Sequence, residues 1–244
     1  MSVDQATIQN YVVLFEEILS KHHIHASKAD LANIYQLVLL TFKLDDYYDS
    51  SHGFNQPREL ETIQQSMITL MPCQDEIAIN AIEQLFQGMV AEKQLDFSQS
   101  FQQYLQVGSK SIGAQLISGY LASKDGISPK VWFSKTITQL NYEVNCLIRL
   151  ANDYLDVTVD KTRTKHETRQ IKAVHFFRDR FRFKTELMSR YVIHKTHYYI
   201  CLVLFWFLKV AFQSKEHLGA IHCLESALDW AVKVYMVDKA SCQT

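Results

Sequence analysis

Residues that form turns are scarce along this chain, whose 244 residues include only seven glycines and three prolines. Apolar residues recur almost from end to end with the 3.6-residue period of an amphipathic helix, and no segment shows the alternation typical of a strand. Hydrophobic residues make up 48% of the sequence, which is enough for a sizeable core. The pattern predicts an all-α protein in which antiparallel helices pack as a bundle, with residues 1–244 forming a single domain.

The expected helices follow from the places where this period is interrupted. Turn-forming residues predict breaks at 50–53 before Pro57, at Met71-Pro72, at Gly108-Ser109, and at 124–126 before Pro129. The helices are therefore expected near residues 5–20, 27–50, 57–70, 74–93, 97–108, 110–124, 129–160, 170–213 (with an internal break) and 215–238.

Charge and cysteine content exclude several classes of function. The net charge of −1 gives no electrostatic reason to expect a nucleic-acid partner. Five scattered cysteines without a CxxC pair argue against a zinc site or a disulfide framework and favour a reducing compartment.

Residues 1–10 lack the pattern of a signal peptide. The longest apolar stretch, 198–208, is shorter than the about twenty residues of a membrane span. We therefore expect a cytoplasmic protein without a stable membrane span.

A first acidic segment, Leu44-Asp45-Asp46-Tyr47-Tyr48-Asp49, ends an apolar helical run. Asp45 and Asp49 are four residues apart and share one face of a helix. Carboxylates on a helix usually belong to a solvated face or to i,i+4 ion pairs. Here the neighbouring Lys43 has the wrong spacing for such a pair, and no basic residue lies within a turn after Asp46 or Asp49. The segment therefore favours a metal-binding role over a solvated face.

A second acidic segment, residues 149–160 with the sequence RLANDYLDVTVD, ends another apolar run. Asn152, Asp156 and Asp160 recur at i, i+4 and i+8, so they form a column of oxygen donors along one helix face. Such oxygens suit Mg²⁺, which is usually held by a few carboxylates together with substrate phosphates. Two columns facing each other across a bundle would trap a diphosphate through bridging metal ions.

These motifs resemble those of the class I terpene synthases. Residues 45–49 look like their DDxxD motif, residues 149–160 resemble RLxNDxx(S/T)xxxE, and residues 104–113 resemble the segment where a helix of that family breaks beneath the substrate's reactive carbon. The second motif departs from the family pattern, because aspartate stands at both 156 and 160. Asp153 and Asp156 also make it similar to a second DxxD, as in chain-elongating prenyltransferases.

The resemblance implies a helical bundle of the class I isoprenoid synthase type that ionises a prenyl diphosphate with Mg²⁺, three ions being expected with the diphosphate bound. The carbocation would then cyclise, lose a proton or take up water. The implied site residues are Asp45, Asp49 and Arg149 for catalysis, Asp45, Asp46, Asp49, Asn152, Asp156 and Asp160 for the metal, and Arg149 and Lys161 for the diphosphate. For Arg149 a salt bridge to Glu143 or Asp153 is the alternative.

The second motif and the compact chain favour a C20 substrate, either linear or supplied as a bicyclic diphosphate by a separate class II cyclase. A carbocation also needs a dry pocket with aromatic walls. Aromatic residues in predicted core helices are Phe42, Phe101, Tyr104, Trp132, Tyr142, Phe205, Trp206, Trp230 and Tyr235. Two other functions stay open, namely a small prenyltransferase that joins an allylic diphosphate to an acceptor and a non-catalytic helical interaction protein. A homodimer is also left open.

Overall fold

The computed structural model describes residues 5–49, 57–95, 100–159, 201–212 and 214–241. Within these ranges there is no strand, as the sequence period predicts. The helices are α1 (Gln5–Lys21), α2 (Lys28–Asp49), α3 (Pro57–Leu70), α4 (Glu76–Glu92), α5 (Phe101–Ser111), α6 (Ala114–Lys124), α7 (Pro129–Trp132), α8 (Lys135–Val159) and α11 (Lys215–Ser241), and residues 201–211 are also helical. None of the described helices is both long and apolar enough to cross a membrane.

Most helix ends lie where the sequence predicts them. α2 ends at Asp49 and α3 begins at Pro57. Asp75 caps α4 by accepting a hydrogen bond from the Ala78 backbone N–H at 2.8 Å, which satisfies a donor that the first turn leaves without a helical partner. α6 is followed by Gly126, whose φ of +68° lies in the left-handed region that favours glycine.

The predicted break at Gly108-Ser109 is wrong. α5 continues through both residues to Ser111, and the chain turns instead at Gly113, which has a φ of +78°. Both glycines lie in the stretch 104–113 that resembles the family's broken helix, but only the backbone of Gly113 leaves the helical region.

The single helix predicted over residues 129–160 is also wrong at its start. The first turn is a separate helix, α7, and α8 begins at Lys135. Between them, the N–H of Ser134 bonds to the carbonyl of Val131, three residues back, so the α-helical ladder is interrupted. Of the helix predicted over 170–213, the part before residue 201 lies outside the described residues.

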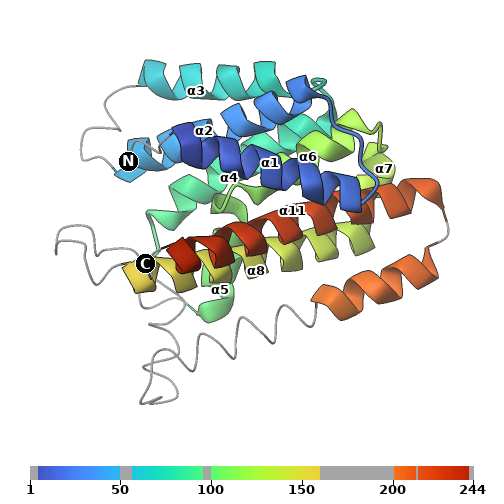
Figure 1. Cartoon of the computed structure of the whole chain (residues 1–244). Helices are drawn as coiled ribbons and strands as arrows, with labels where there is room; N and C mark the ends of the chain where they lie inside the picture. The colour runs from blue at the N-terminus through green and yellow to red at the C-terminus, as the bar shows by residue number, and fades with distance from the viewer. Residues whose placement is uncertain (1–4, 50–56, 96–99, 160–200, 213, 242–244) are drawn as a thin grey trace, which may run out of the picture.

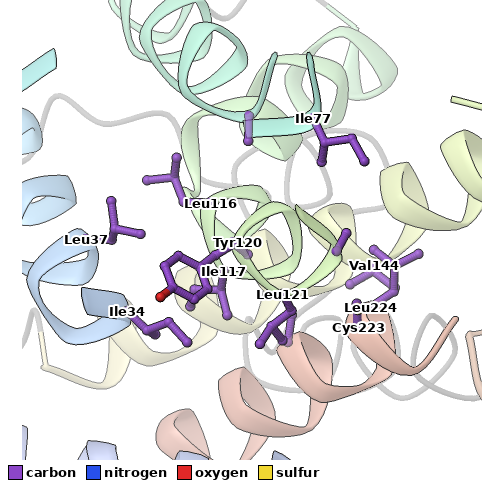
Figure 2. Packing of buried hydrophobic residues seen from close by; sticks show 14 of the residues in the cluster. Ile34, Leu37, Ile77, Leu116, Ile117, Tyr120, Leu121, Val144, Cys223 and Leu224 are labelled. Atoms are coloured by element: carbon purple, nitrogen blue, oxygen red, sulfur yellow. The ribbon is translucent and has the colours of Figure 1, made fainter. Parts of the chain in front are cut away.

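Helix α6 runs through the centre of the bundle. Its residues from Ala114 to Ser123 are all buried, and Figure 2 shows side chains approaching it from four other helices. Leu37 comes from α2, Ile77 from α4, Val144 from α8 and Leu224 from α11. A helix without a polar face needs neighbours on every side, and these neighbours give the protein its main apolar core.

The ends of α2 and α8 lie on the same side of the bundle in Figure 1. α2 and α8 run in the same direction, and both end on the left in Figure 1. α5 packs against α4 and α8, where Tyr104, Leu105, Cys146 and Leu150 form a second, smaller apolar cluster. The two acidic segments are thus carried to one end of the molecule, with α5 beside α8.

Candidate active site

The first acidic segment forms the last turns of α2. Tyr47 and Tyr48 face the interior and are buried, whereas Asp45 is half-buried and Asp46 is exposed. This division follows from the helical period, since neighbouring residues point about 100° apart. The side chain of Asp49 lies outside the described residues. The segment therefore has an apolar face that fixes it to the core and an acidic face directed away from it.

The electrostatics of this helix end favour a bound cation. α2 has no basic residue in its last turn, and carboxylates there are opposed by the negative end of the helix dipole. Lys43, the nearest basic residue in sequence, forms an ion pair with Glu59 of α3 at 3.3 Å. A cation bound at the segment would relieve both the repulsion among the carboxylates and their repulsion from the dipole.

The second acidic segment occupies the end of α8. Asn152 is half-buried and Asp153 is buried. The backbone of Asp156 is helical, but its side chain lies outside the described residues, as do Asp160 and Lys161 entirely. Of the three predicted metal ligands in this segment, Asn152, Asp156 and Asp160, the structure describes the side chain of Asn152 alone.

The donors on both helix ends fit a hard divalent cation. Carboxylate and carboxamide oxygens are the ligands that Mg²⁺ prefers, and Asp45, Asp46 and Asn152 supply them at the ends of α2 and α8. Among the side chains that the structure describes, no three or more His, Cys, Asp or Glu residues are grouped so as to hold a metal ion. The assignment of the metal ligands thus stays a prediction.

The last turn of α5 and the break that follows it contact the two helices that carry the acidic segments. A Cβ added to Gly113 would lie 2.7 Å from Cγ2 of Thr41 in α2, and one added to Gly108 would lie 2.8 Å from Cγ of Arg149 in α8. The two glycines are five residues apart along the chain. α2 and α8 therefore approach the same short stretch of chain, each at a position where glycine allows close contact.

Each of these contacts lies one helical turn before an acidic residue. Thr41 precedes Asp45 by four residues, and Arg149 precedes Asp153 by four. Because α2 and α8 run in the same direction (Figure 1), both segments extend beyond the break toward the same end of the bundle. The stretch that resembles the family's broken helix does contain the break, and the acidic segments start on either side of it.

Arg149 is buried within a polar cluster drawn from three helices. Its Nη2 lies 2.7 Å from Oε1 of Glu92 in α4, and its Nε lies 3.3 Å from Oδ1 of Asp153. Nε also donates to the Tyr104 hydroxyl of α5 at 3.1 Å, and the guanidinium carbon lies 5.5 Å from the centre of the Tyr104 ring. The Tyr104 hydroxyl in turn donates to Oδ2 of Asp153. We call these four residues the Arg149 cluster.

Charge within the cluster shifts the pKa of its members. Burial raises the pKa of the Tyr104 hydroxyl well above its ordinary value, and the charge of Asp153 raises it further. Burial alone would raise the pKa of Glu92, but Arg149 and a hydrogen bond from Ser111 lower it below its usual range. Tyr104 therefore stays a neutral donor and Glu92 a carboxylate at neutral pH.

The salt-bridge alternative left open for Arg149 is present at Asp153 and not at Glu143, which accepts a hydrogen bond from Gln139 at 2.8 Å. Sequence reasoning missed Glu92 and Tyr104 as partners of Arg149. Both are far from it in sequence, and no local spacing indicates such a contact. The diphosphate-binding role of Arg149 stays a prediction.

The aromatic residues expected for a pocket wall occupy different environments. Tyr104, Trp132 and Phe205 are buried, whereas Phe42 and Trp206 are 47% and 62% exposed. The side chain of Tyr235 lies outside the described residues. Tyr104 belongs to the Arg149 cluster, so its hydroxyl is already committed to polar contacts.

Comparison with known proteins identifies the fold. No protein-family model and no curated protein matches the sequence. Among solved structures, a cucumene synthase variant matches with a TM-score of 0.65 at 8% identity, over 94% of this chain and 94% of that chain. The fold is that of the class I terpene synthases. The linalool/nerolidol synthase from Streptomyces clavuligerus matches with a TM-score of 0.62 at 11% identity, over 92% of this chain and 95% of that one.

These likenesses confirm the predicted all-α fold of the class I isoprenoid synthases. The motifs that carry the sequence resemblance lie between residues 45 and 160, whereas the structural match covers nearly the whole chain. The likeness in fold thus extends beyond the motifs, at 8% sequence identity.

Proposed function

We propose that this protein is a class I terpene synthase that ionises a prenyl diphosphate with the help of Mg²⁺ and releases diphosphate. The carbocation then cyclises, loses a proton or takes up water. The observation that carries this proposal is the arrangement of the two acidic helix ends in a terpene synthase fold. Helices α2 and α8 both end on the left in Figure 1. Both also contact the chain at or just before the helix break at Gly113.

The residues proposed to hold the metal are Asp45, Asp46 and Asp49 on α2 and Asn152, Asp156 and Asp160 on the second acidic segment. Bound Mg²⁺ supplies Lewis-acid stabilisation of the departing diphosphate, on which about three negative charges gather. The buried Tyr47 and Tyr48 fix the end of α2 to the core, which keeps its donors oriented. Lys161 is proposed to contact the diphosphate as well.

The contacts of Asp153 support a synthase over a chain-elongating prenyltransferase. A second DxxD motif would need Asp153 and Asp156 as paired metal ligands. Both carboxylate oxygens of Asp153 are already engaged, by Arg149 and by the Tyr104 hydroxyl. Elongation also needs a second diphosphate pocket with additional cations, and α3 after the first segment offers only Arg58 among its basic residues.

We propose a C20 substrate, linear or already bicyclic, on the basis of the second motif. The test is incubation with C10, C15 and C20 prenyl diphosphates and Mg²⁺, with and without a coupled class II cyclase. Released pyrophosphate and the organic extract are measured, the latter by mass spectrometry. Pyrophosphate that appears only when isopentenyl diphosphate or another acceptor is added would support the prenyltransferase instead.

Two variants make this assay specific for the site. Asp45→Asn should abolish most pyrophosphate release, because it removes a charge from the proposed metal column. Glu61→Gln removes an exposed carboxylate from the neighbouring helix α3 and should leave the rate unchanged. Equal activity of the two variants would contradict the proposed site.

A thermal shift separates the enzyme from a non-catalytic helical protein. A ligand that binds the folded state alone raises the melting temperature, by about 2.7 kcal/mol of added stability at a concentration 100 times its dissociation constant. Mg²⁺ together with pyrophosphate should therefore raise the Tm of the wild-type protein and should do so less for Asp45→Asn. No shift with either ligand would favour an interaction protein.

A further inference from the structure

The Arg149 cluster is a closed polar network inside the bundle. Tyr104 is fully buried, and Arg149 and Asp153 expose only 6% and 5% of their surfaces. Glu92 ends α4, and Ser111, which ends α5, helps to lower its pKa. The cluster therefore links α4, α5 and α8 to one another near the α5–α6 break.

The charges of the cluster argue against a direct role in attracting diphosphate. The one positive charge of Arg149 faces two carboxylates, Glu92 and Asp153, at 2.7 and 3.3 Å. The group as a whole thus has no surplus positive charge. A buried ion network is weak evidence for stability, and its best-attested use is to fix a register between elements.

The register that this cluster fixes is that of the second acidic segment. Arg149 and Asp153 share a face of α8, and Asn152 and Asp156 continue along adjacent positions over the next turn. The Tyr104 hydroxyl forms hydrogen bonds with both Arg149 and Asp153. It therefore restrains α8 next to Asn152, the first residue of the proposed metal column. Groups that hold metal ligands in place from behind typically change metal affinity 10- to 100-fold when they are removed.

We propose that the Arg149 cluster is a support for the metal-binding end of α8, in which Tyr104 is a positioning residue and Arg149 acts within the protein rather than on the diphosphate. This proposal rests on the proposed function in so far as it assigns the supported residues to a metal. The mechanical part, that Tyr104 restrains the end of α8, holds for the protein without any ligand and can be tested separately.

The test is Tyr104→Phe, which keeps the ring and removes the hydroxyl from between Arg149 and Asp153. Hydrogen exchange of the ligand-free protein should accelerate at least about tenfold for backbone amides of residues 150–159, because that helix end loses its restraint. In turnover assays the Mg²⁺ concentration for half-maximal rate should rise about tenfold or more. The KM for prenyl diphosphate at saturating Mg²⁺ should stay within about twofold of the wild-type value, since no substrate contact is lost.

Tyr120→Phe is the matched control. Tyr120 is also fully buried, and its hydroxyl also donates to an aspartate across two helices, Asp30 at 2.9 Å. Its loss should lower stability without changing either exchange at residues 150–159 or the dependence on Mg²⁺. If Tyr104→Phe does not fold, Glu92→Gln, which keeps the shape of the side chain, should produce the same two changes.

Two outcomes would overturn the proposal. Unchanged exchange of residues 150–159 in folded Tyr104→Phe would show that Tyr104 does not restrain α8. A raised KM for prenyl diphosphate with an unchanged Mg²⁺ dependence would show that the cluster contacts the substrate. If the wild-type protein releases no pyrophosphate from any prenyl diphosphate, the proposed function fails, and the exchange measurement still decides whether Tyr104 restrains the helix.

Discussion

Gly113→Ala tests the contact between the helix break and the first acidic helix. The added methyl group meets two obstacles. A non-glycine residue in the left-handed region costs about 1–2 kcal/mol, and the φ of Gly113 is +78°. The new Cβ would also lie 2.7 Å from Cγ2 of Thr41. Forcing a methyl group into a packed site costs about 1–3 kcal/mol.

Thr41 cannot easily move away from such a methyl group. It is β-branched, and its hydroxyl donates to the Leu37 carbonyl at 2.9 Å, which holds its rotamer. The two effects therefore add, and we expect Gly113→Ala to lower the free energy of unfolding by about 2–5 kcal/mol. At about 2–4 °C per kcal/mol for a chain of this size, the Tm should fall by several degrees or more.

Two further variants separate the two contributions. Gly126→Ala is the matched control, because Gly126 has a φ of +68° but would place its Cβ with no atom within 4 Å. The free energy of unfolding of Gly126→Ala should fall by the cost of the left-handed backbone alone, about 1–2 kcal/mol. Adding Thr41→Ser to Gly113→Ala keeps the hydroxyl and removes the methyl group, so it should recover most of the steric part.

The measurement is urea denaturation followed by circular dichroism for five proteins, namely the wild type, the three variants above and the Thr41→Ser single variant that completes the double-mutant cycle. If Gly113→Ala costs no more than Gly126→Ala, or if Thr41→Ser restores nothing, the close contact between the break and α2 does not exist in solution. A loss in Gly126→Ala below about 0.5 kcal/mol would refute the backbone part of the reasoning.

Three shorter predictions concern the acidic segments and the interior. Asp45→Ala should lower turnover at least about 100-fold while the Tm of the ligand-free protein stays equal or rises, because a carboxylate at a helix C-terminus opposes the dipole. Asn152→Ala should lower turnover in a way that higher Mg²⁺ partly restores, which a titration of rate against Mg²⁺ will show. Burial lowers the pKa of His22, but hydrogen bonds and charges from Asp229 and Glu225 raise it above its ordinary value overall. Its stabilising contribution is therefore complete below pH about 6.5 and is lost as pH rises through the raised pKa. The difference in unfolding free energy between wild type and His22→Gln should be largest below pH about 6.5 and should shrink as pH rises above it.

The helical plan was predictable because its signals are local. Pro57, Gly126 and Pro129 each interrupt a helix through their own backbone chemistry, and the structure ends or begins helices beside them. The period of apolar residues predicts most of the helices, and this prediction does not require knowing which helices pack against one another. For this reason the fold class and most helix bounds follow from the sequence.

The position of the helix break did not follow from local signals. Gly108 and Gly113 lie in one stretch, and either could supply a left-handed turn. Their roles are set by different neighbours, since Gly108 gives room to the Arg149 side chain and Gly113 to Thr41. Residues more than 35 positions away in sequence thus decide which glycine turns the chain.

The Arg149 cluster was beyond sequence reasoning for the same reason. The i,i+4 spacing of Arg149 and Asp153 predicts an ion pair within α8, and the pair is present. Glu92 and Tyr104 come from other helices, and their approach depends on how α4 and α5 pack. Neither Glu92 nor Tyr104 belongs to a sequence pattern that would predict a contact with Arg149.

The break between α5 and α6 ties the two acidic segments to each other. Gly113 packs against α2 one turn before Asp45, and Gly108 packs against α8 one turn before Asp153. Packed interiors have few voids and transmit displacement instead of absorbing it. A side chain added at Gly113 must therefore move either α2 or the break itself, and the last turn of α5, just before the break, is held to α8 through the close contact of Gly108. Residues 108–113 thus contact both helices that carry the proposed metal columns. We therefore expect a change there to alter Mg²⁺ dependence as well as stability, whereas the same change at Gly126 should alter stability alone.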